Sequence, residues 1–162
     1  MKELKISWNT TYKAIKKVSE DIKNNCISYD SMLVLNRGSM VFGGILGYKL
    51  GIRRIEYMDI DVIYTKNYTE IVKKIINSPL ERGTLTGKVL FVTDIVHSGN
   101  TIMEGVKQLK KEYPNNLFDF ATLFYIPNNN IKPKYYYKLM KKKKWIVFPW
   151  DEVGYVPMSN HI

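Results

Sequence analysis

The sequence is poor in cysteine, and this indicates the compartment in which the protein works. Its 162 residues include one cysteine, Cys26. A single cysteine excludes an internal disulfide and is typical of a reduced, intracellular protein. Neither a histidine nor an acidic residue stands beside Cys26 in the sequence, which argues against a catalytic thiol.

Long apolar runs are also missing. The first residues, Met1–Lys5, contain no apolar stretch of the kind that a secretory signal requires. The longest weakly polar segment, Gly38–Gly47, is rich in glycine and much shorter than the roughly 20 apolar residues of a membrane helix. We therefore expect a cytoplasmic protein without a membrane-spanning segment.

Acidic residues are outnumbered by basic ones. There are 25 lysines and arginines against 15 acids, which gives a net charge of +10. A basic surface can attract nucleic acid, or basic residues can serve a polyanionic small molecule. Lysine, isoleucine, asparagine and tyrosine are all abundant, so we favour compositional drift as the source of the charge. Nucleic acid is the less favoured partner.

What the sequence does contain is an alternation of strand and helix patterns. Apolar residues at helical spacing predict a helix over 10–24, with Asn9 or Thr10 as its N-cap. The other expected helices are Val41–Leu50, stopped by Gly51, and a helix that starts near Asn100. The expected strands are Met32–Leu35, Ile55–Tyr64, Val89–Val92 and Leu117–Phe124, and the polar stretch 65–86 is expected to hold a short helix over Glu70–Ile76.

This order predicts the α/β class, with a parallel sheet flanked by helices in one domain over residues 1–162. In such sheets ligands bind at the carboxyl ends of the strands, near the point where the strand order reverses. Two segments follow strands in this way, 36–39 and 93–101. Both are candidate ligand loops.

The segment Val89–Thr101 has the form of a phosphate site, because an apolar strand runs through a short polar loop into a helix. Gly99 lets a ligand approach the backbone closely, and the amides of Ser98–Thr101 lie at the positive end of the helix dipole. Asp94 could accept hydrogen bonds from sugar hydroxyls or hold a metal-bound water. The alternative is a plain strand–turn–helix in which Ser98 or Asn100 is only the N-cap.

Several segments together resemble the type I phosphoribosyltransferases. Val89–Thr101 resembles the thirteen-residue phosphoribosyl pyrophosphate signature of that family. Val34–Ser39 resembles its pyrophosphate loop, and Leu50–Arg53 follows as it commonly does. Trp145–Asp151 resembles the base-binding hood of the xanthine–guanine branch. These motifs occur in the family's order, over roughly Ile6 to Pro157.

The resemblance implies a core over about 6–127, a small C-terminal hood over about 128–162, and a homo-oligomer, either dimer or tetramer. It implies an enzyme of purine salvage that transfers the 5-phosphoribosyl group of phosphoribosyl pyrophosphate to a nucleobase, with Mg²⁺ as cofactor. The implied residues are Asp94 and His97 for catalysis, with Asp94 also at the metal; Ser98, Gly99, Asn100 and Thr101 for the 5′-phosphate; Arg37, Gly38 and Ser39 for pyrophosphate; and Trp145 and Ile146 for the base.

The sequence departs from the family pattern at several of these positions. Thr93 replaces one of two adjacent acids, and His97 replaces the acid that opens the phosphate loop, near the base. Ile126 stands where the purine branch commonly has a lysine for the 6-oxo group, and Ser39 replaces a glycine. Residues 65–86 correspond to the family's flexible lid. These departures support a second hypothesis: a degenerate member that binds nucleotide or phosphoribosyl pyrophosphate as a regulator, with RNA as a partner.

Overall fold

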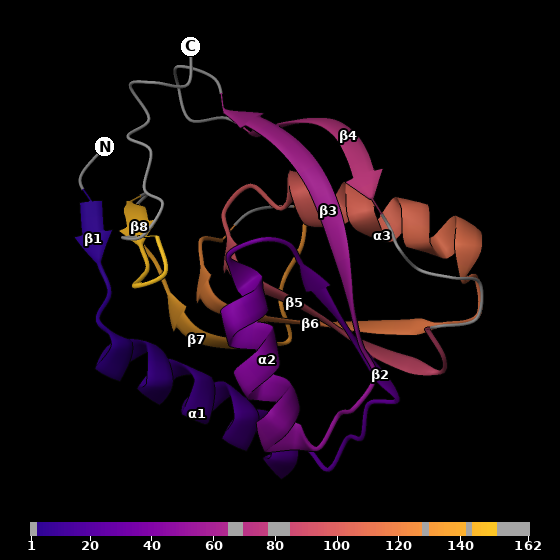
Figure 1. Cartoon of the computed structure of the whole chain (residues 1–162), viewed down its shortest axis with the longest axis horizontal. Helices are drawn as coiled ribbons and strands as arrows, with labels where there is room; N and C mark the ends of the chain where they lie inside the picture. The colour runs from indigo at the N-terminus through magenta and orange to yellow at the C-terminus, as the bar shows by residue number, and fades with distance from the viewer. Residues whose placement is uncertain (1–2, 65–69, 78–84, 128–129, 142–143, 152–162) are drawn as a thin grey trace.

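The computed structural model describes residues 3–64, 70–77, 85–127, 130–141 and 144–151. Its helices and strands follow one another in the order labelled in Figure 1. They are β1 (Glu3–Lys5), α1 (Trp8–Asn24), β2 (Ser31–Leu35), α2 (Ser39–Leu50), β3 (Ile55–Tyr64), β4 (Glu70–Asn77), β5 (Lys88–Val96), α3 (Asn100–Glu112), β6 (Leu117–Tyr125), β7 (Tyr135–Leu139) and β8 (Trp145–Val147).

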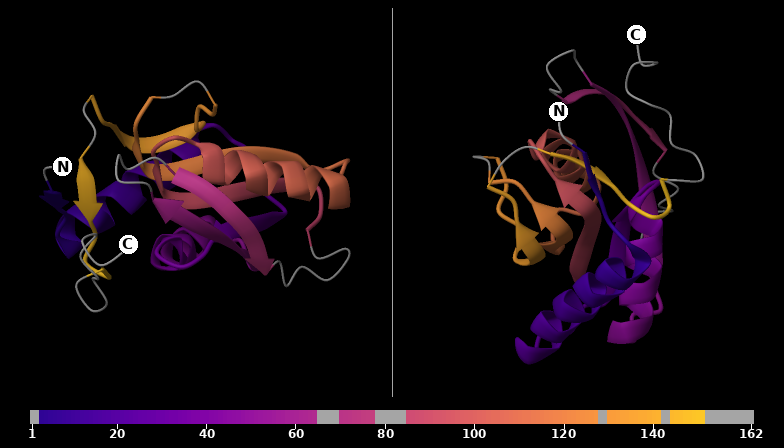
Figure 2. Two further views of the ribbon diagram at one scale, coloured as in Figure 1. Left: turned by 90° about the horizontal axis from the view of Figure 1, so that it is seen from above. Right: turned by 90° about the vertical axis from the view of Figure 1, so that its left-hand side faces the viewer.

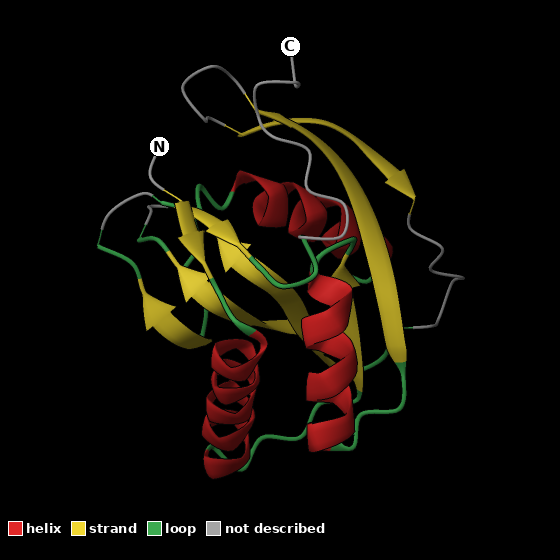
Figure 3. Ribbon diagram, turned by 60° about the vertical axis from the view of Figure 1, so that its left-hand side comes forward, coloured by secondary structure: helices red, strands yellow, loops and turns green. Residues whose placement is uncertain are grey.

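The main sheet has six strands in the order β4-β3-β2-β5-β6-β7. Its strands pair in parallel, except that β4 is antiparallel to β3. Helices α1 and α2 lie side by side against one face, and α3 covers the other (Figure 3). This confirms the expected α/β class with a parallel sheet flanked by helices.

The central strands are buried on both faces and therefore read as unbroken apolar runs. In β5, Leu90 and Val92 contact the core beneath α1 and α2, whereas Val89 and Phe91 contact the core beneath α3. Burial of both faces explains why this strand could be predicted from its sequence.

The helix ends differ slightly from their expected positions. Helix α1 begins earlier, because Ser7 is its N-cap and the Ser7 hydroxyl accepts a hydrogen bond from the Thr10 amide at 3.2 Å. The expectation of Asn9 or Thr10 as the cap was wrong. Helix α2 ends at Gly51, which has a left-handed conformation with φ of 71°, as predicted.

The expected short helix over Glu70–Ile76 is also wrong, since these residues belong to β4. They pair with β3, for example Ile71 with Ile63 and Val72 with Val62. Their β-branched side chains favour a strand once a partner is present, and that partner is not visible in local periodicity. The remaining parts of the expected lid, residues 65–69 and 78–84, lie outside the described residues.

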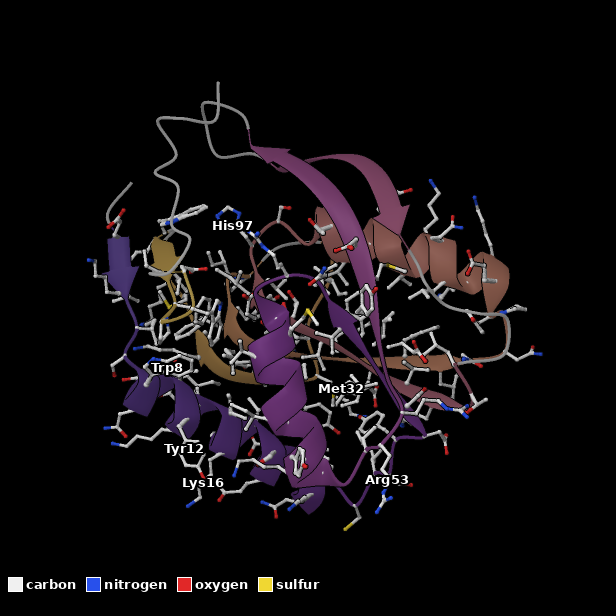
Figure 4. All side chains as sticks on the ribbon, viewed as in Figure 1. Trp8, Tyr12, Lys16, Met32, Arg53 and His97 are labelled. Carbon is white, nitrogen blue, oxygen red and sulfur yellow. The ribbon has the colours of Figure 1, made fainter. Side chains whose placement is uncertain are left out.

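The strand order reverses between β2 and β5. The chain leaves β2 through α2 to reach β3 on one side, and leaves β5 through α3 to reach β6 on the other. The loops after β2 and β5 therefore meet at the same edge, where ligands bind in sheets of this kind. Figure 4 shows His97 at this edge and Arg53 at the opposite one.

The C-terminal segment is divided between two sheets. Strand β7 extends the main sheet beside β6, whereas β8 pairs with β1, so that Trp145 lies opposite Glu3. Figure 2 shows this small sheet standing apart from the main one. The N-terminal strand thus supports the segment expected to form the hood. Residues 152–162 lie outside the described residues, and no described helix has the length and apolar character needed to cross a membrane.

Two glycines of α2 give a test of this packing. A Cβ on Gly43 would lie 2.5 Å from Cγ2 of Val34, and a Cβ on Gly47 would lie 2.5 Å from Cδ1 of Ile55. Val34 is buried and stiff at χ1, whereas Ile55 is 40% exposed and its end can turn away. We expect Gly43→Ala to lower the free energy of unfolding by about 1–3 kcal/mol.

Gly47→Ala is the matched control and should be near neutral or slightly stabilising, because alanine favours the helix. Urea unfolding of both variants makes the comparison. Equal destabilisation by the two changes would contradict the assigned packing of α2 on β2.

Candidate active site

The loop between β2 and α2 lies directly against β5. The Asn36 amide donates to the Met58 carbonyl oxygen at 2.8 Å, the Asn36–Arg37 peptide bond is cis, and the Arg37 side chain is exposed. A Cβ on Gly38 would lie 2.6 Å from Oδ2 of Asp94. A side chain at this position would force the Asp94 carboxylate to move, so glycine allows this close approach.

Ser39 connects the same loop to β5. Its side chain is buried, and its hydroxyl accepts a hydrogen bond from the Asp94 amide at 2.9 Å. The Ser39 hydroxyl, which we expected at the pyrophosphate, thus also fixes the backbone of Asp94. A second glycine at this position would lack that contact.

Asp94 is the most perturbed acid of this edge. Burial first, and repulsion from the Asp151 carboxylate second, raise the pKa of Asp94 to about 6, against hydrogen bonds from the Ile95 amide and from Ser39 that lower it. Burial also raises the pKa of Asp151, although the Phe148 amide donates to its carboxylate at 2.8 Å and Arg37 lowers the pKa. Two carboxylates from distant parts of the sequence therefore act on one another here.

Thr93 does not replace the missing acid. Its side chain is buried, and its hydroxyl donates to the Ile95 carbonyl oxygen at 3.2 Å. The carboxylate that accompanies Asp94 comes instead from Asp151, after β8.

This donor set fits a magnesium ion. The described residues contain no cluster of three histidine, cysteine or acidic side chains that could hold a metal. Mg²⁺ does not require one, since it usually keeps several waters and binds one or two carboxylates together with substrate phosphates. Asp94 and Asp151 are carboxylates that could hold such an ion, and its positive charge would offset the repulsion that raises the pKa of Asp94.

The loop after β5 has the geometry of an anion site. Gly99 has φ of 78° and directly precedes α3, which begins at Asn100. The Ser98 hydroxyl accepts a hydrogen bond from the Asn100 amide at 3.1 Å. Asn130, after β6, donates to the Ser98 carbonyl oxygen at 2.9 Å and to Oδ1 of Asn100 at 2.8 Å. Asn130 therefore braces this loop, which also contains Thr101 at the first turn of α3.

The expected base-binding residues differ in exposure. Trp145 is half-buried, whereas the Ile146 side chain is 7% exposed and belongs to the core beneath α1 and α2. Ile146 can therefore border a ligand only through its backbone. Trp150 stacks on Phe148, with ring centroids 4.6 Å apart and planes 8° from parallel.

No lysine occupies the position expected to contact a 6-oxo group. Ile126 is 7% exposed and packs into the core. Lys134 forms an ion pair with Asp119 at 2.8 Å, near the amino ends of β6 and β7 and away from the site. His97 directly follows β5 at this edge of the sheet.

Sequence reasoning missed three residues of this edge: Asp151, Trp150 and Asn130. The segment Phe148–Asp151 carried a signal for the first two, because an aromatic pair followed by an acid is exceptional beside the lysine-rich stretch before it. No local sequence signal pointed to Asn130, since its contacts join segments that are 30 and 32 residues apart.

Comparison with known proteins finds a family model and a curated relative that match most of the chain. A family model described as the phosphoribosyl transferase domain matches residues 7–154. The xanthine-guanine phosphoribosyltransferase of Gluconobacter oxydans (strain 621H) is 23% identical over 146 residues, which cover 90% of this chain and 83% of the relative.

Solved structures show the same fold. A purine phosphoribosyltransferase from Pyrococcus horikoshii matches with a TM-score of 0.69 and 23% identity, over 93% of this chain and 94% of that one. The xanthine-guanine-hypoxanthine phosphoribosyltransferase of Helicobacter pylori matches with a TM-score of 0.71 and 21% identity, over 91% and 92%. A Neisseria gonorrhoeae protein with bound ppGpp matches with a TM-score of 0.72 and 22% identity, over 99% and 93%.

The raised pKa of Asp94 predicts a pH dependence of stability. Because its pKa is about 6 in the folded protein and about 3.9 in an unfolded chain, the folded state holds the proton more tightly. Ionisation then costs stability as the pH rises from about 4 through about 6. We expect Asp94→Asn to raise the free energy of unfolding by roughly 1–3 kcal/mol at pH 7.5, and by much less at pH 4.5.

Urea unfolding of wild type and variant at both pH values measures this difference. Asp151→Asn should act in the same direction and less strongly, because it removes the repulsion and the burial of the Asp151 charge but also loses the interaction with Arg37. A difference between wild type and Asp94→Asn that does not change with pH would contradict the assigned burial and pairing.

Proposed function

The chain belongs to the phosphoribosyltransferase family, and we propose that it transfers the 5-phosphoribosyl group of phosphoribosyl pyrophosphate to a purine base and releases pyrophosphate. The observation that carries this proposal is the contact between Gly38 and Asp94, which joins the two candidate loops at the point where the strand order reverses. A role in purine salvage and a cytoplasmic location remain our expectation for such an enzyme.

Each loop has a distinct part in this proposal. The loop that contains Gly99 binds the 5′-phosphate, through backbone amides, the hydroxyls of Ser98 and Thr101, and the positive end of the α3 dipole. The loop Arg37–Ser39 binds pyrophosphate, with the exposed Arg37 side chain as its cation. Asn100 is held by Asn130 and shapes the first loop.

We assign Mg²⁺ to the carboxylates of Asp94 and Asp151. A bound Mg²⁺ would neutralise negative charge on the departing pyrophosphate. Asp94 would also accept hydrogen bonds from the ribose hydroxyls. The partly buried position of both acids keeps their oxygens oriented, which limits the reorganisation that the reaction requires.

In the reaction, the bond between C1 of the ribose and the pyrophosphate oxygen breaks, and a bond forms between C1 and a ring nitrogen of the base. The proton on that nitrogen must leave, and we assign its removal to His97, whose ordinary pKa range suits proton exchange near neutral pH. Catalysis otherwise rests on positioning and on stabilising the leaving group.

The base lies against Trp145, where an aromatic ring can stack on any flat heterocycle. The names of the relatives support a purine, since one acts on xanthine and guanine and another on hypoxanthine as well. Ile126 cannot offer a positive charge to a 6-oxo group, and Lys134 is paired with Asp119. We therefore propose weak discrimination among the 6-oxopurines, because discrimination depends on hydrogen bonds to the edge of the base.

A second candidate is a binding module that senses a nucleotide or phosphoribosyl pyrophosphate without turnover, with RNA as a partner. The replacement of acids by Thr93 and His97 favours it, as does the bound ppGpp of the Neisseria gonorrhoeae structure. We rank it second, because Asp151 restores a carboxylate beside Asp94.

We also propose a homo-oligomer, a dimer or a tetramer. Helix α2 is apolar on all sides, with Lys49 as its single charged residue. Its outer stripe leaves Met40 48% and Tyr48 94% exposed. A helix of this composition is normally covered on every side, and an uncharged face is where two copies of a strongly basic chain can approach.

A panel of bases tests the proposal. With phosphoribosyl pyrophosphate and Mg²⁺, we expect pyrophosphate release with guanine, xanthine and hypoxanthine, at kcat/KM values within about tenfold of one another. Removal of Mg²⁺ with a chelator should abolish turnover. Tight ligand binding without release of pyrophosphate from any base would support the sensor, and a strong preference for guanine would contradict the account of Ile126.

A further inference from the structure

One buried polar group of this edge has no part in the proposed reaction. Nε1 of Trp150 is shielded from solvent and has no hydrogen-bond partner among the described residues. An indole nitrogen is a donor only. Since buried donors are nearly always paired in native proteins, an unpaired one requires an explanation, such as a ligand that is not yet bound.

The indole ring is held firmly in place. Phe148 covers one face, with planes 8° from parallel, and the Trp8 ring packs against it at 64° with the centroids 6.1 Å apart. The face stacked on Phe148 is not available to a base. The orientation of the N–H is therefore fixed by these two rings.

The edge that carries the N–H faces the loop expected to bind pyrophosphate. The position of a Cβ on Gly38 would be 3.2 Å from Nε1 of Trp150 and 2.6 Å from Oδ2 of Asp94. The indole N–H, the Asp94 carboxylate and the backbone of Gly38 therefore lie close together. The Asp94 carboxylate does not accept the indole hydrogen bond, so the donor remains available.

We propose that Trp150 donates its indole N–H to an oxygen of the pyrophosphate group held by Arg37–Ser39. This inference rests on the proposed function and extends it, because the proposed reaction gives Trp150 no role. An oxygen of a phosphate is the acceptor that fits, since a charged acceptor forms the stronger hydrogen bond. The adjacent Asp151 interacts with Arg37, which places the segment around Trp150 beside that loop.

Through this contact the C-terminal hood would bind the pyrophosphate as well as the base. Trp145 and Trp150 belong to one short segment, so the residues that frame the base would also contact the leaving group. Binding of pyrophosphate would then be linked directly to the segment that forms one side of the base pocket. The loss of Trp150 should affect pyrophosphate affinity more than affinity for the phosphoribosyl part.

Titration calorimetry of the whole protein tests this with inorganic pyrophosphate and Mg²⁺. Trp150→Phe keeps an aromatic ring on Phe148 and removes only the N–H. We expect it to weaken pyrophosphate binding about tenfold, the effect of one charge-assisted hydrogen bond. Binding of ribose 5-phosphate, which we assign to the loop at Gly99 and to Asp94 and not to Arg37–Ser39, should change less than about twofold. Trp8→Phe is the matched control, because it removes an indole N–H from the same aromatic group, and both affinities should be those of wild type.

A spectroscopic measurement on wild-type protein is independent of whether Trp150→Phe folds. The three tryptophans give three indole ¹H–¹⁵N resonances, which single replacements of Trp8 and Trp145 assign by elimination. Addition of pyrophosphate with Mg²⁺ should move the Trp150 resonance downfield and leave that of Trp8 in place. An unmoved Trp150 resonance, or equal pyrophosphate affinity in Trp150→Phe and wild type, overturns the inference.

The inference and the proposed function fail in different ways. A protein that binds pyrophosphate with the Trp150 shift but releases none from phosphoribosyl pyrophosphate and any base refutes the proposed enzyme and retains the contact. Turnover with an unmoved Trp150 resonance retains the enzyme and refutes the contact. A Trp150 shift that follows the ionisation of Asp94 without pyrophosphate overturns the inference in favour of an Asp94 partner.

Discussion

The close approach of the Gly38 backbone to the Asp94 carboxylate is the constraint on which the candidate site depends. It joins the first turn of α2 to the end of β5, and the hydrogen bond from the Asp94 amide to Ser39 fixes the two segments in the same relation. Both segments meet because β2 and β5 are neighbours in the sheet although about 55 residues separate them in the chain. A ligand that contacts both loops must therefore lie across the reversal of the strand order, which is where α/β sheets bind nucleotides and sugar phosphates.

Electrostatics make this edge unusual for the protein. The chain carries a net charge of +10, yet two acids, Asp94 and Asp151, lie close enough that repulsion contributes to the raised pKa of Asp94. Such a pair is costly in the unliganded protein and becomes favourable beside a divalent cation. Arg37 and the amides before α3 provide the complementary positive potential for phosphate groups. The arrangement is suited to an anionic substrate that arrives with a metal ion, as we propose for phosphoribosyl pyrophosphate.

The features predicted from sequence were those that local patterns determine. Unbroken apolar runs marked β2 and β5, Gly51 marked the end of α2, and Gly99 marked the loop before α3. Features that depend on distant partners could not be predicted. Strand β4 forms because β3 lies beside it, and Asp151 lies close to Asp94 although 57 residues separate them in the chain. Local spacing also cannot show that Ile146 faces the core or that Lys134 pairs with Asp119, and both facts alter the expected base pocket.

The most direct test of the central claim compares two glycines of the same conformation. Gly99 and Gly51 both have positive φ, 78° and 71°, but only Gly99 lies in the loop to which we assign the 5′-phosphate. Gly99→Ala and Gly51→Ala therefore impose similar backbone strain, and the affinity for phosphoribosyl pyrophosphate with Mg²⁺ can be measured by calorimetry on both. The account predicts that binding is lost in Gly99→Ala and retained in Gly51→Ala. Wild-type affinity in Gly99→Ala, or an equal loss in the two variants, would contradict it.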